Sequence, residues 1–210
     1  MRMLAIPTCT VLLFFAIAFP LQAGSVSSRD WEHVAENDGI TIWKREVPGV
    51  EVPSFRGEVV IDADIDAVGN AIQDWQHHAQ WMHRCAESKQ LERLGESESL
   101  LYNRTDSPWP VSDRDVVLRT KRQVSPDGSD ILLSFQNVET DLKPAVHGVV
   151  RMPKLSGFYK LTRLRPAKTQ VVYQVEANLG GSLPPWMVKR VVEDMPYETL
   201  ARLRDRLAPD

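Results

Sequence analysis

The sequence is poor in cysteine, and this limits how the fold can be held together. It contains two cysteines, Cys9 and Cys85. Cys9 lies in a segment that we expect to be removed from the mature protein, which leaves Cys85 alone. The mature chain then has no intrachain disulfide, so its hydrophobic core must stabilise it. We expect Cys85 to be a half-buried structural thiol.

The chain also lacks a strong excess of charge of either sign. Its 25 Lys and Arg residues are nearly balanced by 28 Asp and Glu residues, which gives a formal net charge of −3 at pH 7. This mildly acidic balance argues against nucleic acid as the main partner. It argues equally against strong electrostatic docking on anionic lipid.

Common catalytic motifs are missing as well. The sequence has no Gly-x-Ser-x-Gly nucleophile motif and no glycine-rich loop of the kind that cradles phosphate groups. His77, His78 and His83 lie near Cys85, but they lack the short paired spacing typical of zinc ligands, and a solvated helix end is the better interpretation. We therefore predict no catalytic residue, no metal and no cofactor.

An apolar stretch stands out at the N-terminus. Arg2 is followed by VLLFFAIAF at 11–19, which is too short to cross a bilayer, and small residues near Ala23 offer a cleavage point. This pattern predicts a secretory signal peptide over 1–23 and a single mature domain over 24–210, with an uncleaved anchor as the alternative. We accordingly expect an exported protein, either periplasmic or secreted.

The mature sequence alternates between two hydrophobic periods. Capping serines predict a short helix over 29–36, and apolar residues at helical spacing predict an amphipathic helix over 66–82. Period-two alternation predicts strands, which we place at 40–47, 55–61, 116–120, 131–136, 147–152, 158–164 and 171–177. A final long helix is predicted from Pro185 onward, because proline suits a first helical turn.

This order of elements predicts an α+β fold in which one curved antiparallel sheet is covered by few helices. The stretch 180–188, GGSLPPWMV, joins the last strand to the last helix. Its glycines permit a sharp turn and its prolines set where the helix begins. We interpret it as a hinge in front of a lid helix, and we expect the loops at 125–130 and 151–157 to loosen with it.

Four segments, taken in order, resemble the START domain family, the steroidogenic-acute-regulatory-related lipid-transfer proteins, in its bacterial exported form. They are Trp31 with 38–45, the helix over 68–81, SPWPVSDRD at 107–115 and GSLPPW at 181–186. The resemblance implies a helix-grip fold, in which a curved antiparallel sheet wraps a long C-terminal helix. It also implies an internal hydrophobic tunnel that holds one lipid-like molecule.

The family often carries a buried charge pair, whose positions fall here on Arg104 and Thr120. The pair is therefore not reproduced, and no particular ligand is carried over from the resemblance. Arg104 shares a predicted strand face with Leu100 and Tyr102, so it could present a guanidinium to a phosphate or carboxylate head group in the tunnel. The alternative places Arg104 at a strand end, facing water.

Strand and helix faces give a set of predicted ligand-binding residues: Tyr102, Arg104, Leu118, Phe135, Tyr173, Trp186, Val188 and Val192. The expected function is binding and transfer of a hydrophobic ligand by a monomer in transient contact with membranes. Two alternatives stay open. One is an enzyme that acts on a hydrophobic small molecule, and the other is an interaction module that grips a protein partner in the same groove.

Overall fold

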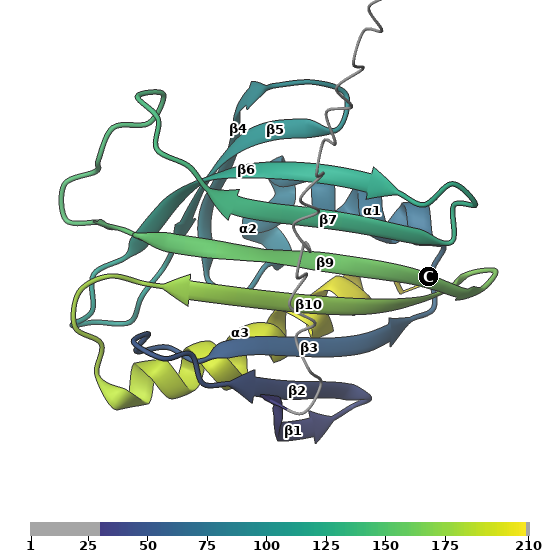
Figure 1. The fold of residues 1–210 in the computed structure, drawn as a ribbon, viewed down its shortest axis with the longest axis horizontal. Coiled ribbons are helices and arrows are strands. Elements are labelled where there is room, and N and C mark those ends of the chain that lie inside the picture. The colour runs from purple at the N-terminus through teal and green to yellow at the C-terminus, as the bar shows by residue number, and fades with distance from the viewer. Residues whose placement is uncertain (1–29, 209–210) are drawn as a thin grey trace, which may run out of the picture. The chain divides into compact units, whose positions relative to one another are not determined.

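The computed structural model describes residues 30–208, and the predicted signal peptide lies outside them. Residues 31–208 form one antiparallel sheet of ten strands with the helices gathered on one face (Figure 1). The α+β helix-grip prediction is thus confirmed. Within the described part of the chain, no helix has the length and apolar character needed to cross a membrane.

The strands follow one another in space in the order β1-β2-β3-β10-β9-β7-β6-β5-β4, with β8 parallel to the start of β6. The early strand β3 therefore pairs directly with the last strand β10. The bounds are β1 Glu32–Asn37, β2 Ile40–Arg45, β3 Ser54–Ile61, β4 Cys85–Arg93, β5 Glu98–Thr105, β6 Arg114–Val124, β7 Asp130–Asn137, β8 Val150–Arg151, β9 Lys154–Arg165 and β10 Lys168–Asn178.

The helices are shorter and more broken than predicted, except the last. The predicted helix over 66–82 divides at Asp74 into α1 Ile65–Gln73, a single 3₁₀ turn η2 Trp75–His77 and α2 His78–Trp81. Asp64 caps α1, because its carboxylate accepts a hydrogen bond from the Asp66 amide at 3.0 Å. The final helix is α3 Pro185–Arg206, with Pro185 in its first turn as predicted.

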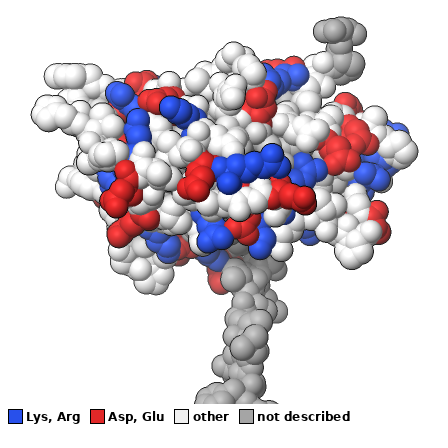
Figure 2. Space-filling model, turned by 90° about the horizontal axis from the view of Figure 1, so that it is seen from above, with Lys and Arg blue, Asp and Glu red and all other residues white. Residues whose placement is uncertain are grey.

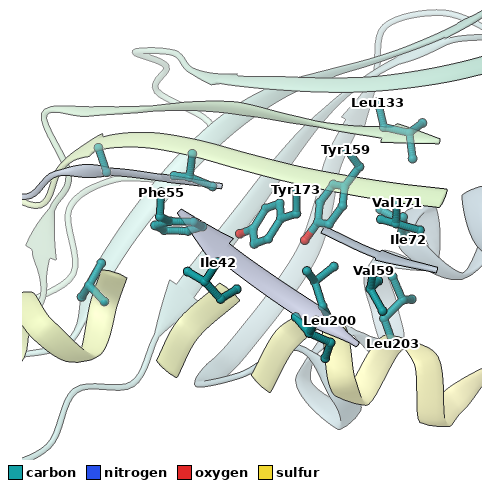
Figure 3. Close-up of a cluster of buried hydrophobic side chains, with 14 of the residues drawn as sticks. Ile42, Phe55, Val59, Ile72, Leu133, Tyr159, Val171, Tyr173, Leu200 and Leu203 are labelled. Atoms are coloured by element: carbon teal, nitrogen blue, oxygen red, sulfur yellow. The ribbon is translucent and has the colours of Figure 1, made fainter. Parts of the chain in front are cut away.

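The core lies between the concave face of the sheet and α3 (Figure 3). Leu200 and Leu203 of α3 are fully buried and belong to the same cluster as Ile42 of β2. The helix approaches β3 at Gly57, where an added Cβ would stand 2.7 Å from a Leu200 methyl carbon. Any larger residue at this position would push α3 away from the sheet.

One sequence prediction at the start of the chain and one in its loops are wrong, and one strand was missed. Residues 32–37 form strand β1 instead of a helix. Only Val34 in this strand is half-buried, so the segment has no hydrophobic period that could have indicated a strand. β4 was not predicted at all. The segment 151–157, expected to be a loop, is largely β8 and the start of β9.

The turn between β10 and α3 contains the predicted hinge. Gly180 and Gly181 have φ angles of 70° and 67°, in the left-handed region that glycine occupies at little cost. The turn at 125–129 joins β6 to β7 at the end of the sheet opposite to Arg114, where β6 begins, so it lies far from this hinge. The hinge and the turn at 125–129, which we expect from the sequence to loosen together, are therefore at opposite ends of β6.

Candidate ligand-binding site

A largely apolar cavity lies between the concave face of the sheet and the helices. Its volume is about 120 Å³ when counted over the centres of water-sized spheres, a measure on which one water molecule needs about 10–15 Å³. The sheet contributes alternate residues from several strands, as the pleat requires. They include Phe55, Leu118, Leu133, Phe135, Tyr159 and Tyr173.

The helix α3 closes the cavity with residues spaced four apart. Met187, Val191, Met195 and Thr199 line the space, and residues at this spacing share one face of an α-helix. The two methionines are flexible and polarizable, so they can adapt to an irregular apolar ligand. The lid predicted from the sequence is therefore one wall of the cavity, with its lining face set by these four residues.

Two stacked tyrosines lie side by side at the centre of the concave face (Figure 3). The rings of Tyr159 and Tyr173 are 4.2 Å apart between centroids and nearly parallel, at 5°. Burial raises the pKa of Tyr173 to about 12 and that of Tyr159 well above its usual value. Both hydroxyls are thus neutral polar groups within an apolar space, able to bind a ligand through hydrogen bonds.

A buried histidine lies beside them, on α2. His78 is 2% exposed, and its ring packs edge-on against Trp75 and Trp81. Its Nε2 atom lies 2.7 Å from the carbonyl oxygen of Ile72, so this nitrogen carries the proton and donates. Burial lowers the pKa of His78 to about 4. The imidazole is therefore neutral near pH 7, and its Nδ1 atom has no hydrogen-bond partner among residues 30–208.

His78 corrects the expectation of a solvated helix end. The chain after α1 turns inward through η2, and this turn carries His78 beneath the tryptophans. Cys85 also lines the cavity, and burial raises the pKa of its thiol to about 11, so it is not a thiolate at neutral pH. No group of three or more His, Cys, Asp or Glu side chains within the described residues is placed to hold a metal ion.

Arg114 is the charged residue that lies deepest in the wall. It begins β6, is 4% exposed and lines the cavity. Its guanidinium donates hydrogen bonds to two backbone carbonyls, those of Ser112 and of Gly180, the second at 3.4 Å. Desolvation lowers the pKa of Arg114, yet a guanidinium stays protonated in proteins. The wall therefore holds a fixed positive charge.

Of the eight residues predicted to bind ligand, three border the cavity: Leu118, Phe135 and Tyr173. Their part in binding stays a prediction. The three from α3 do not border it. Trp186 is 42% exposed and its ring lies under Arg190, while Val188 and Val192 pack into the core beside the lining face. The start of α3 is apolar on more than one side, so its sequence did not identify the face that meets the cavity.

The other two predicted residues, Tyr102 and Arg104, lie on the convex face of the sheet. On β5 the lining residues are Leu101, Asn103 and Thr105, which places the even-numbered residues on the other side. The Tyr102 hydroxyl donates to Asp115 at 3.2 Å, and Arg104 is ion-paired with Asp113 at 2.5 Å. The guanidinium expected in the tunnel is provided by Arg114 instead.

Arg114, Tyr159 and His78 were not among the predicted site residues. For Arg114 the sequence does contain a signal, because Val116, Leu118 and Thr120 were assigned to one strand face. Extending this alternation back by two residues reaches Arg114. For His78 no such signal exists, since its burial follows from the break of the helix at Asp74 and from packing of α2 against β4 and α3.

The comparisons with known proteins agree with this geometry. The fold is that of helix-grip proteins that enclose a ligand between a sheet and a C-terminal helix. The sequence pattern of the START domain matches residues 20–208, and the chain belongs to the START domain family.

Two bacterial relatives are similar over most of their length. An uncharacterized protein of Pseudomonas aeruginosa is 34% identical over 182 residues, which cover 87% of this chain and 89% of the relative. The crystal structure of a STAR-related lipid transfer protein fragment from Xanthomonas axonopodis is 34% identical. Its TM-score is 0.75, and the match covers 85% of this chain and 98% of that one.

More distant relatives come from animals. Rat phosphatidylcholine transfer protein is 23% identical over 171 residues, which cover 80% of this chain and 79% of the relative. Human StAR-related lipid transfer protein 5 has a TM-score of 0.78 at 20% identity, with 87% of this chain and 88% of that chain covered. At this identity the likeness shows the shared fold.

Proposed function

We propose that this protein binds one lipid-like molecule in the cavity between the sheet and α3, and carries it between membranes. The single observation that carries the proposal is a largely apolar cavity between the sheet and the C-terminal helix of a START domain. Each methylene group that leaves water for such a space contributes about 0.8 kcal/mol, so a lipid tail supplies ample affinity. The relatives named for lipid transfer support carriage.

Catalysis is not part of the proposal. Cys85 and His78 are the cavity residues most suited to nucleophilic or acid–base work, and burial opposes both roles. The thiol keeps its proton at neutral pH, and the histidine stays neutral with one nitrogen committed to Ile72. Export is included in the proposal because residues 1–23 have the composition of a signal peptide.

The proposal includes a place of membrane contact, the loop between β5 and β6. Trp109 in this loop is 91% exposed, the most exposed of the large apolar residues within 30–208. Its neighbour Pro108 borders a small pocket against Met187 on α3, and Ser107 lines the main cavity. Tryptophan favours the interface between water and lipid, so Trp109 can hold the cavity end against a bilayer.

Ligand binding is tested by filling the cavity. Leu118→Trp places a large side chain in the space, and Leu164→Trp makes the same change at an exposed position of β9. We expect the first variant to bind a fluorescent fatty acid at least about tenfold more weakly and the second to bind as the wild type. Extraction of the purified full chain and mass spectrometry should show a bound lipid. A protein that carries none and accepts no fatty acid, phospholipid or sterol analogue contradicts the proposal.

Carriage is tested separately. Trp109→Ala should slow the transfer of a fluorescent lipid between vesicles several-fold without weakening binding, because only membrane contact is lost. The matched control is Leu94→Ala, which removes an exposed apolar side chain from the turn at the other end of β5. If both variants transfer at the wild-type rate, the β5–β6 loop is not the contact.

A further inference from the structure

Arg114 is the one buried arginine among residues 30–208, and it lacks an acidic partner. Arg104, Arg119, Arg122 and Arg151 each reach a carboxylate within 4.0 Å. No carboxylate of residues 30–208 lies that close to Arg114. The adjacent Asp113 is already engaged, since its two oxygens accept from Arg104 and from the Ser107 amide.

The hydrogen-bonding capacity of this guanidinium is only partly used. A guanidinium has five N–H donors, and the two backbone carbonyls engage one terminal nitrogen each. The Nε atom is buried and has no partner among residues 30–208. A buried positive charge without a counter-ion is costly for a fold to maintain. Such a group calls for an anion that is not part of the described chain.

The strand geometry directs this group toward the cavity. Arg114 has the same parity as Leu118 and Thr120, which line the space, whereas Asp115 faces the convex side. Ser107 provides a second donor at the same end. Its amide is bonded to Asp113, its hydroxyl has no partner among the described residues, and its side chain borders the cavity.

The charge of the cavity wall favours one sign of ligand. No Asp or Glu of residues 30–208 lines the cavity, whereas Arg114 and Lys121 do. Lys121 reaches Glu98 at 3.3 Å on the exposed end of β6, so its charge is matched. Arg114 is thus left as the unmatched charge in the wall, and no carboxylate of the described residues lines the cavity to receive a cationic head group.

We propose that the ligand is an acidic amphiphile, whose single carboxylate or phosphate binds Arg114 and Ser107. Its apolar tail extends along the tyrosine pair and the methionines of α3. Charge-assisted hydrogen bonds to a buried guanidinium are strong, and both carboxylate and phosphate groups can accept two of them from one guanidinium. This inference rests on the proposed function and adds the chemical class of the ligand.

The test uses two pairs of ligands that differ in charge but share the tail. Palmitate is compared with methyl palmitate, and 1-palmitoyl lysophosphatidate with 1-palmitoylglycerol, by titration at pH 8. In the wild-type protein we expect the acid of at least one pair to bind about 10- to 100-fold more tightly than its neutral partner. The pair with the larger ratio distinguishes a carboxylate from a phosphate.

Variants test whether Arg114 causes the preference for the acidic ligand. In Arg114→Gln the ratio should fall below about threefold while the neutral ligands bind as in the wild type, which also shows that the fold is intact. Arg114→Lys should keep part of the ratio, because it keeps the charge. The control Arg119→Gln removes an exposed guanidinium of the same strand, paired with Glu98 and not with Asp113, and should leave the ratio unchanged.

Each failure has its own meaning. Equal binding of acid and neutral ligands to the wild type overturns the inference and leaves lipid binding standing. A ratio that survives in Arg114→Gln overturns the role of Arg114. If none of the four ligands binds, the proposed function itself fails. Should Arg114→Gln not fold, the wild-type ratios and the lipid extracted from wild-type protein decide, and an extract of only neutral or zwitterionic lipids counts against the inference.

Discussion

Near the start of β6, the buried polar groups of the convex face are hydrogen-bonded, whereas those of the concave face are partly without partners. On the convex face, Asp115 is 1% exposed and accepts hydrogen bonds from Tyr102 and Arg151. On the concave face, Arg114 and Tyr159 are as deeply buried, yet each has a polar atom without a partner among the described residues. Groups that are fully paired serve the fold, and groups that surround a cavity unpaired are available to a ligand.

The ion pairs of the convex face belong to a surface on which the two signs are mixed. Figure 2, which views the molecule from above the view of Figure 1, shows Lys and Arg side chains interspersed with Asp and Glu side chains, without a broad area of either sign on that side. Exposed pairs of this kind contribute little to stability. Asp115 is the exception, since its carboxylate is buried and its partners depend on it.

The largest expected effect comes from removing Asp115, the buried hydrogen-bond acceptor of the convex face. Asp115→Ala removes the acceptor of the Tyr102 hydroxyl and the carboxylate partner of Arg151, which keeps only backbone carbonyl acceptors, and it should lower the free energy of unfolding by about 3–5 kcal/mol. Urea unfolding followed by circular dichroism measures this. The control is Arg104→Gln, whose pair with Asp113 is more exposed, so its loss should be much smaller. Equal losses in the two variants would remove the distinction between them.

A pH titration tests the concave side, with a smaller effect. The pKa of His78 is about 4 in the folded protein, against about 6.5 in an unfolded chain. Between these values the unfolded state binds more protons, so stability is full above about pH 6.5 and is lost as the pH falls toward 4. The loss reaches up to about 3 kcal/mol.

The variant His78→Gln isolates this contribution. An amide can still donate to Ile72 but does not titrate, so the fall in unfolding free energy between pH 6.5 and 4.5 should become shallower. The burial that lowers the pKa of His83 leaves a second, smaller slope in the same range. An unchanged profile in His78→Gln would show that His78 is solvated in the folded protein.

The smallest expected effect comes from the same substitution, tyrosine to phenylalanine, on each face of the sheet. Tyr102→Phe removes a hydroxyl bonded to Asp115 and should lower the free energy of unfolding by about 1–2 kcal/mol. Tyr159→Phe removes a buried hydroxyl without a partner, and it should leave stability unchanged or raise it by up to about 1 kcal/mol. Losses of the same size on both faces would mean that Tyr159 is bonded in the free protein.

The sequence predicted the sheet best where one face of a strand is buried and the other is wet. β10 alternates cleanly, with Val171, Tyr173 and Val175 inward, and β6 does so around Leu118. β1 and β4 were misjudged or missed because they are edge strands whose residues are mostly exposed. An exposed strand carries no period from which to predict it.

The error at Arg104 has a different cause. Leu100, Leu101 and Tyr102 are buried in succession, so β5 shows no alternation. Lys143 lies in the long loop after β7, and Arg151 follows that loop. Both lie over the convex face, with the Lys143 ammonium 4.0 Å from the ring of Tyr102. This cover comes from a segment about 40 residues away, and local sequence cannot reveal which face of β5 it hides.

The pairing of β3 with β10 also determines when the sheet can be completed during synthesis of the chain. Ile61 must meet Thr169, and Phe55 must meet Val175, so the middle of the sheet joins early residues to late ones. A ribosome that has reached residue 165 has made β1–β3 and β4–β9 but not the strand that pairs with both groups. The last strand and the helix after it supply that connection and the final wall together. A nascent or truncated chain therefore has no enclosed cavity, and only the finished polypeptide can compete for a ligand.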